Sequence, residues 1–332
     1  MKNILLIPKI KIQNANALSS PYTIGFPAMT AWLGGAHALQ RKLNETGFKD
    51  IRITGTAISS HEIKLDRHKD QNDYFYSIVG SRNPIDKDGK SPIFIEAPKC
   101  DLTVSLILKI ESESESESES ESESESLIKE IRNQLVMMKL AGGDIISFNS
   151  PKLFSTDESD FALLIKELMP SYILIDRREL MQEEMENGQD AIDAMLDYLS
   201  VKNRSETFLQ DYSYVSIKPK KRIAGWKDNF SFSYKKDTEK NVNTDTEKDL
   251  IRWVAQRKTR GWIIPIAIGF QAISKLGKAK NQIDPSKQHC FAESIVTLGE
   301  FVMPYRIKNI NEMLWHYHYD SENELYLCNQ NK

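Results

Sequence analysis

Residues 3–59 read NILLIPKIKIQNANALSSPYTIGFPAMTAWLGGAHALQRKLNETGFKDIRITGTAIS, and this stretch decides the class of fold. Apolar residues cluster over residues 3–12, as in a buried strand. The small polar residues of QNANALSSP (13–21) predict a loop. A helix is expected to follow, with Pro27 in its first turn, where the missing N–H of proline costs nothing. A second strand is then expected over residues 51–59.

Strand-like and helix-like segments alternate through the rest of the chain. We expect an extended hairpin over residues 61–92, strands over 102–110, 172–175 and 261–269, and helices over 127–140, 160–169, 179–199, 291–298 and 311–318. These interleaved elements predict an α+β fold. The sequence contains neither the glycine pattern of dinucleotide-binding folds nor a P-loop, so it gives the nucleotide-binding α/β folds no support.

Residues 111–126 are eight Glu-Ser repeats, and they conceal a basic balance in the remainder. The formal net charge is −3, but without the eight glutamates the chain has 44 basic and 39 acidic residues. The run has no hydrophobic face and repels itself, which predicts a disordered insertion. A solvated acidic segment would repel RNA, so we expect it to point away from any RNA-binding face.

The remaining charge is uneven along the chain. Residues 154–200 contain 12 acids and 3 bases, whereas residues 201–260 contain 15 bases and 8 acids. A basic region in a nearly neutral chain suits a polyanionic partner, and it equally suits a solvated charged surface.

Cysteine and histidine usage argues against a disulfide framework or a metal site. Cys100, Cys290 and Cys328 are far apart and form no CxxC pair, so they read as reduced thiols of a cytosolic protein. His316 and His318 share one face only if their segment is a strand, and no cysteine is nearby. No apolar run has the length of a membrane span and the N-terminus lacks a signal-peptide pattern, so we expect no membrane association.

Three short polar loops have the composition of anion-binding loops. QNANALSSP places amides and hydroxyls between a strand and a helix start, where backbone N–H groups bind phosphate. The turn SRNP contains Arg82, which can bond a phosphate or stack on a base. In MKLAGGD, Lys139 precedes Gly142 and Gly143, which let a backbone approach a ligand closely. Taken singly, each loop is also explained by a turn or a helix cap.

Seven segments in the same order resemble the family of the second Csy protein of type I-F CRISPR complexes, a divergent branch of the fifth Cas family. They are residues 7–43, SRNPIDKDG (81–89), LTVSLIL (102–108), MKLAGGDI (138–145), GWIIPIAIGFQAIS (261–274), LGEFVMPYRI (298–307) and LWHYH (314–318). They cover most of the chain, with weaker stretches over residues 151–250. The Glu-Ser run departs from the pattern of the family.

The resemblance implies a modified ferredoxin-like core of the RNA-recognition-motif type, with a protruding hairpin near residues 60–95. It divides the chain into a first part of the core (1–110), the disordered Glu-Ser insertion (111–126), a helical accessory region (127–210) and a part that completes the core (211–332).

The resemblance also implies a non-catalytic, RNA-binding subunit of the prokaryotic cytoplasm that serves antiviral DNA interference. Such a subunit pairs with the large subunit of the complex and caps the 5′ handle of the CRISPR RNA, next to a backbone of repeated subunits. It needs no cofactor or metal. The resemblance does not decide whether the subunit contacts target DNA. The residues that the resemblance implies at the handle are Asn14, Asn16, Ser19, Ser20, Arg82, Lys139, Gly142 and Gly143.

Two other functions remain alternatives at this point. A metal-independent endoribonuclease acting on CRISPR RNA precursor would need a general base, and His37 with Ser19 or Ser20 is the set that the sequence offers. Otherwise His37 is a core or interface histidine of the first helix. The second alternative is an unrelated cytosolic α+β enzyme, which requires the seven matches to be accidental.

Overall fold

The structure is a computed structural model that describes residues 3–80, 87–89, 97–112, 121–208, 250–280, 282 and 284–330. Contacts divide the chain into two compact units, Met1–Leu199 with Thr259–Lys332, and Ser200–Lys258. In the second unit, β12 (Lys202–Phe208) pairs antiparallel with β13 (Leu250–Gln256). Most of the basic region noted in the sequence, residues 209–249, lies outside the described residues.

The first unit contains five α-helices among its described residues. They are α1 (Met29–Glu45), α2 (Glu121–Val136), α3 (Glu158–Leu168), α4 (Arg178–Glu186) and α5 (Ala191–Leu199). The strands of its main sheet are β1 (Ile4–Asn16), β4 (Ile51–Leu65), β7 (Lys99–Ser112), β8 (Lys139–Leu140), β9 (Gly143–Ser147), β10 (Lys152–Phe154), β11 (Tyr172–Asp176), β14 (Trp262–Ala272), β15 (Ala292–Val302), β16 (His316–Asp320) and β17 (Leu325–Asn329). Two small ladders pair β2 (Leu18–Ser20) with β3 (Thr23–Ile24) and β5 (Arg67–His68) with β6 (Ser77–Ile78).

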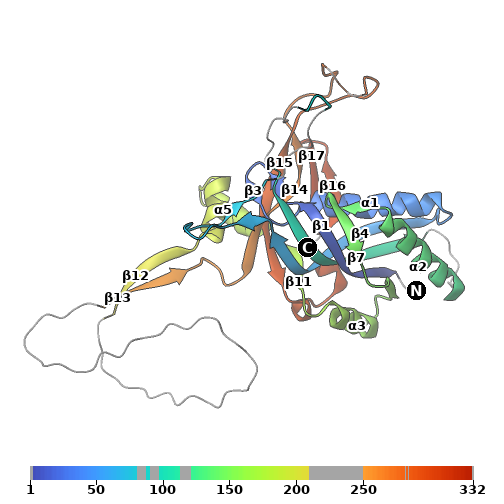
Figure 1. The fold of residues 1–332 in the computed structure, drawn as a ribbon, viewed down its shortest axis with the longest axis horizontal. Helices are drawn as coiled ribbons and strands as arrows, with labels where there is room; N and C mark the ends of the chain where they lie inside the picture. The colour runs from blue at the N-terminus through green and yellow to red at the C-terminus, as the bar shows by residue number, and fades with distance from the viewer. Residues whose placement is uncertain are drawn as a thin grey trace, which may run out of the picture. The chain divides into compact units, whose positions relative to one another are not determined.

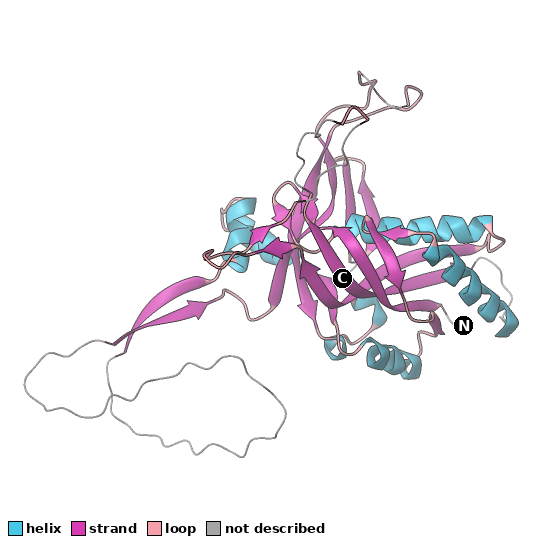
Figure 2. Ribbon diagram, viewed as in Figure 1, coloured by secondary structure: helices cyan, strands magenta, loops and turns pink. Residues whose placement is uncertain are grey.

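The main sheet is antiparallel, with the order β16-β17-β14-β15-β11-β4-β7-β1-β9-β8, and β10 also pairs with β1. Helix α1 connects β1 to β4, and α2 connects β7 to β8. Figure 1 shows these two helices next to each other, and Figure 2 shows the strands that they accompany. The predicted α+β class is therefore confirmed.

The centre of the sheet is buried on both faces. Along β1, Leu5 and Ile7 pack into the core under α1 and α2, whereas Ile4 and Leu6 pack into a second core with α3. Successive side chains of a strand point to opposite faces, so burial on both faces requires apolar residues in succession. This explains why β1 begins with the run ILLIP and does not alternate with polar residues.

The sheet curls so that its C-terminal end returns to its middle. The N–H of Thr56 in β4 donates to the Trp315 carbonyl at 3.0 Å, and the N–H of Trp315 donates back at 2.8 Å. Trp315 is fully buried, and its Nε1 donates to the Leu174 carbonyl at 3.0 Å. Strand β16, at one end of the strand order, begins directly after this residue. A buried tryptophan contributes about 3–5 kcal/mol, so the contact holds the curl closed.

Two helices expected near the C-terminus are strands in the structure. Residues 291–298 belong mostly to β15, which pairs with β14 along nearly its whole length. Residues 311–318 contain only the end of a short 3-10 turn before β16 begins at His316. The predictions were wrong because sheet pairing outweighs a weak helical spacing, and the β-branched Ile295, Val296 and Thr297 favour a strand.

Other boundaries also differ from the sequence-based expectation. Residues 13–21 were expected to be a loop, but β1 continues to Asn16 and β2 covers Leu18–Ser20. Gly188, with φ +93°, separates α4 from α5 where one helix was expected. Part of the Glu-Ser run is ordered, because Glu111 and Ser112 end β7 and residues 121–126 open α2; residues 113–120 lie outside the described residues.

Candidate functional site

The end of β1 packs against the turn that joins β8 to β9. The N–H of Asn16 donates to the Ala141 carbonyl at 2.8 Å. Gly142 has a left-handed φ of +78°, and a Cβ on Gly143 would lie 2.6 Å from the Gln13 carbonyl oxygen. Gly143 therefore allows a close approach of the β1 backbone, whereas the approach to a ligand expected for Gly142 and Gly143 stays a prediction.

The two asparagines at this end of β1 differ in what their side chains do. Asn14 has φ +59°, its N–H donates to Asp101 Oδ1 at 3.1 Å, and its side chain is exposed. Asn16 binds its own backbone, because its Nδ2 donates to the Leu18 carbonyl and its Oδ1 accepts from the Leu18 N–H. Asn14 is thus the asparagine with its amide available to a ligand.

Ser19 and Ser20 stabilise the small β2–β3 ladder. Both hydroxyls hydrogen-bond with the Thr23 hydroxyl, at 2.9 and 2.7 Å, and the Tyr22 N–H donates to Ser20 Oγ. Ser20 is also buried. The two serines lie near Asn14 and Asn16, and their hydroxyls are occupied by this turn.

Lys139 is the exposed cation of the β8–β9 turn. Its Nζ lies 3.0 Å from Asp144 Oδ1, and the two side chains are 67% and 56% exposed, so the pair is weak and can open to bind another anion. Arg82, the other predicted cation, lies outside the described residues.

An aromatic and basic hairpin emerges at the same end of the sheet. The N–H of Asp66 donates to the carbonyl of Lys99, the residue that pairs with Asn16. Beyond it, the Arg67 guanidinium lies 4.3 Å from the centre of the Tyr76 ring. Tyr74 and Phe75, at the tip, are 90% and 84% exposed. The sequence RHKDQNDYFY carried this signal of interleaved cations and aromatic rings, but it was not assigned to the site.

These segments form one surface, which we call the loop end: residues 14–25, 66–80 and 139–144. Asn16 donates to the Ala141 carbonyl, which joins the first and third segments. Residues 98–99 link the first two segments, because Ala17 donates to the Pro98 carbonyl and Asp66 to the Lys99 carbonyl. The described part of the loop end brings together the predicted residues except Arg82, and it adds exposed aromatic rings and Arg67.

His37 lies elsewhere, in a cavity of about 440 Å³ beside α1. The side chain is exposed at the edge of the apolar stripe of its helix, so of the expected core or interface histidine the core reading was wrong and the interface reading stays a prediction. Gln40, Arg52 and His316 line the same cavity, but Ser19 and Ser20 do not. The described structure therefore does not assemble the catalytic set suggested by the sequence.

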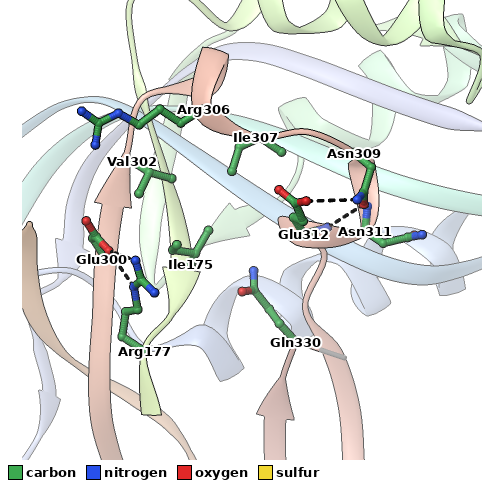
Figure 3. A pocket seen from close by; sticks show the side chains of 10 residues that line it. All are labelled: Ile175, Arg177, Glu300, Val302, Arg306, Ile307, Asn309, Asn311, Glu312 and Gln330. Atoms are coloured by element: carbon green, nitrogen blue, oxygen red, sulfur yellow. Dashed lines mark hydrogen bonds and ion pairs between the residues drawn. The ribbon is translucent and has the colours of Figure 1, made fainter. Parts of the chain in front are cut away.

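A second cavity, of about 520 Å³, opens where β11 and β15 meet the C-terminal segment (Figure 3). Its Arg177 donates to Glu300 Oε2 at 2.6 Å and bonds Glu179 Oε1 at 3.2 Å. Asn309 donates to Glu312 Oε1 at 3.1 Å. The charged groups of this cavity are thus mostly paired with each other.

The other described histidines and cysteines offer no metal centre. His61 uses both ring nitrogens, bonding the Pro170 carbonyl at 2.9 Å and the Ser105 hydroxyl at 2.7 Å, and burial lowers its pKa. Burial raises the pKa of Cys100 and Cys328 to about 12, so both stay protonated. Among the described residues, no group of three His, Cys, Asp or Glu side chains could hold a metal ion, and no helix is long and apolar enough to span a bilayer.

Comparison with known proteins gives two agreeing matches. The family model described as CRISPR-associated protein (Cas_Csy2) matches residues 5–328. The CRISPR-associated protein Csy2 of Pseudomonas aeruginosa (strain UCBPP-PA14) is 27% identical over 347 residues, which cover 97% of this chain and 94% of that relative. Both matches include β1, α1 and the loop end as well as the C-terminal strands. The chain therefore belongs to the Csy2 family of type I-F CRISPR-associated proteins.

Proposed function

We propose that the protein is a non-catalytic, RNA-binding subunit of a type I-F CRISPR surveillance complex. In this role it binds the 5′ handle of the CRISPR RNA through the loop end and pairs with the large subunit of the complex. The complex also contains a backbone of repeated subunits, and it lies in the bacterial cytoplasm.

The composition of the loop end carries this proposal. Single-stranded RNA is bound by stacking on aromatic rings or arginine and by hydrogen bonds to splayed bases and phosphates. The loop end offers exposed rings at Tyr74 and Phe75, cations at Arg67 and Lys139, and the amide of Asn14. Arg82 belongs to the proposed set through its sequence motif alone.

The connectivity of the sheet supports a ferredoxin-like core. The strands β4-β7-β1-β9 are neighbours in that order, and both crossover helices contribute to the core on one face. A split β-α-β-β-α-β unit has this arrangement. Its second helix and fourth strand come from residues 121–147, of which 121–126 were expected to belong to the Glu-Ser insertion and 127–147 to a helical accessory region.

The position of the Glu-Ser run is compatible with an RNA-binding loop end. β7 begins at Lys99, beside the loop end, and reaches the run at Glu111 and Ser112. These two ends of β7 are about 40 Å apart at ~3.3 Å per residue. Most of the negative charge is therefore attached far from the proposed handle-binding surface.

Co-expression tests the assignment as a subunit. The tagged chain, expressed with the proteins of its operon and a CRISPR array, should co-purify with a large subunit and with guide RNA of uniform 5′ end. Recovery of the chain alone and free of RNA would contradict the proposal.

The variant Lys139→Ala tests the surface. Removing one phosphate contact should weaken handle binding and reduce the slope of log affinity against log salt by roughly 0.7. Lys152→Ala is the matched control, because Lys152 is also an exposed lysine paired with a carboxylate (Glu167 at 2.8 Å) but lies on β10. Equal affinity and salt slope for the two variants would remove Lys139 from the site.

A further inference from the structure

The cavity beside His37 has three walls from distant parts of the chain. One face of α1 supplies Leu33, Ala36, His37 and Gln40, at the spacing i, i+3, i+4, i+7. The first half of β4, residues 52–56, supplies the second wall, and residues 315–317 with Tyr326 supply the third. The bridge between Thr56 and Trp315 brings the last two walls together.

The lining of this cavity contains one cation, Arg52, and two histidines, His37 and His316. Among the described residues that line it, none is an aspartate or a glutamate. Arg52 and His37 are exposed, and within the described chain neither side chain has a hydrogen bond or an ion pair. Glu111 lies opposite Arg52 in the pairing of β4 with β7, but it accepts from the Thr54 hydroxyl and forms no ion pair with Arg52, so the guanidinium can still attract an anion.

Two further polar groups are held in fixed orientations. The Ile53 N–H donates to Gln40 Oε1 at 2.7 Å, so the free end of this amide is its NH₂ donor. His316 Nδ1 lies 2.7 Å from the Thr54 carbonyl. A carbonyl only accepts, so Nδ1 carries the proton, and Nε2 of the neutral ring is left as an acceptor. The cavity thus offers an oriented donor and an oriented acceptor.

Gly55 provides the space for this histidine. A Cβ at that position would lie 2.9 Å from His316 Cε1, closer than side-chain carbons approach in proteins. The glycine therefore allows the imidazole to lie against the backbone of β4.

Aromatic rings form the remaining surface. Tyr317 and Tyr326 lie with ring centres 5.5 Å apart, and they are 44% and 38% exposed. Burial and the neighbouring phenol raise the pKa of Tyr317, so the ring stays uncharged. Uncharged rings beside the Arg52 guanidinium suit a ligand with both a flat aromatic group and an anion.

We infer that this cavity binds a nucleotide, with the phosphate at Arg52 and His37 and the base against Tyr317 and Tyr326. Gln40 and His316 supply a donor and an acceptor for the edge of the base or for the ribose hydroxyls. The volume is in the range of small-molecule sites. The nucleotide is either a free mononucleotide or one residue of an RNA strand.

The inference goes beyond the proposed handle binding and does not rest on it. Leu140, next to Lys139, approaches α1 at Gly35. In a helix, Gly35 faces away from the stripe of His37 and Gln40, so the cavity and the β8–β9 turn lie on different sides of α1. The two sites can therefore be tested separately.

The test measures binding of AMP, UMP, inorganic phosphate and a five-nucleotide RNA to the full chain purified without a CRISPR array. Arg52→Ala should weaken nucleotide binding roughly tenfold, since it removes a hydrogen bond to a charged group. Arg41→Ala is the matched control, because Arg41 is an exposed arginine of α1 outside the cavity. Tyr326→Leu should weaken nucleotide binding but not phosphate binding, with an unchanged melting temperature as the check on folding.

Each outcome decides the inference. Comparable binding of mononucleotides and RNA indicates a free nucleotide, whereas much tighter RNA binding with the same Arg52 dependence indicates one residue of a strand. Phosphate binding as tight as nucleotide binding, or equal affinities for Arg52→Ala and Arg41→Ala, would overturn the inference. Handle RNA with Lys139→Ala tests the handle assignment and mononucleotides with Arg52→Ala test this inference, so failure of one is distinguishable from failure of the other.

Discussion

Two cavities of the main unit, one at Arg177 and one at His37, are similar in size but differ in how their charged groups are paired. At Arg177 the guanidinium is held by Glu300 and Glu179, and its cation is largely neutralised by them. At His37 the walls contain Arg52 and two histidines, without a carboxylate among the described lining residues. The comparison teaches that the pairing of a cation, and not its presence, decides whether a cavity can attract an anion.

The two cavities also differ in the polar groups that are left without a hydrogen-bond partner. In the Arg177 cavity one buried atom lacks a partner: the Asp176 N–H donates to Gln330 Oε1 at 2.9 Å, and the Gln330 Nε2 points into the space (Figure 3). A single neutral donor has little selectivity for any ligand class. In the His37 cavity, the Gln40 donor, the His316 acceptor and the Arg52 cation come from three different walls.

The largest effect is expected from a variant that breaks the ion pair between Arg177 and Glu300 in the first of these cavities. Arg177→Ala leaves Glu300, whose side chain is 9% exposed, buried without its cation. Loss of one partner of a buried ion pair lowers the free energy of unfolding by ~3–5 kcal/mol. Because the Arg177 side chain is 35% exposed, we expect a smaller loss, of about 2 kcal/mol. Urea unfolding measures this loss, and nucleotide binding should be unchanged.

The double variant Arg177→Ala with Glu300→Gln is the control for that loss. In the double variant no buried negative charge is left without its cation, so part of the lost stability should be recovered. A double variant that is less stable than Arg177→Ala alone would show that the ion pair is not the source of the effect.

A smaller effect is expected when the His37 cavity is made to resemble the other. Gln40→Glu has nearly the same shape, and the new carboxylate can still accept from the Ile53 N–H. Its charge pairs with Arg52 and repels phosphate, so nucleotide affinity should fall about tenfold with little change in stability. Gln271→Glu, an exposed site on β14, adds the same charge as a control. Equal affinities for the two variants would mean that charge in the cavity does not govern binding.

Much of the fold was predictable because its strands carry strong local signals. β7 and the first half of β1 are runs of apolar residues, and α1 has a regular apolar stripe that ends near Gly47. The C-terminal strands were missed because β15 and β16 have weak local patterns. Their conformation is decided by pairing with β14 and β17, which lie elsewhere in the sequence.

The candidate sites divide in the same way. The segments of the loop end that contain Asn14, Lys139 and Gly143 were recognisable as candidates, since each is a short motif with a distinctive composition, and their role in binding stays a prediction. The nucleotide cavity was not, because Arg52 and His316 carry no local signal and meet only through the bridge of Thr56 with Trp315. Long-range pairing, which a single sequence does not display, creates this site.

The smallest effect is expected from a variant that removes a negative charge at the rim of the His37 cavity. Glu111 lies opposite Arg52 in the pairing of β4 with β7, and it also accepts from the Thr54 hydroxyl at 3.2 Å. Glu111→Gln keeps an acceptor for Thr54 and removes the negative charge beside Arg52. Because exposed charges interact weakly, nucleotide affinity should rise only about two- to threefold.

Salt dependence distinguishes this local effect from a change in net charge. The gain for Glu111→Gln should be present at low salt and vanish near ~1 M salt, where the Debye length is about 3 Å. Glu62→Gln removes the same charge from an exposed position farther along β4, and it should leave nucleotide affinity nearly unchanged. If nucleotide affinity rises equally in both variants, it depends on the net charge of the chain, and the charge next to Arg52 does not matter in particular.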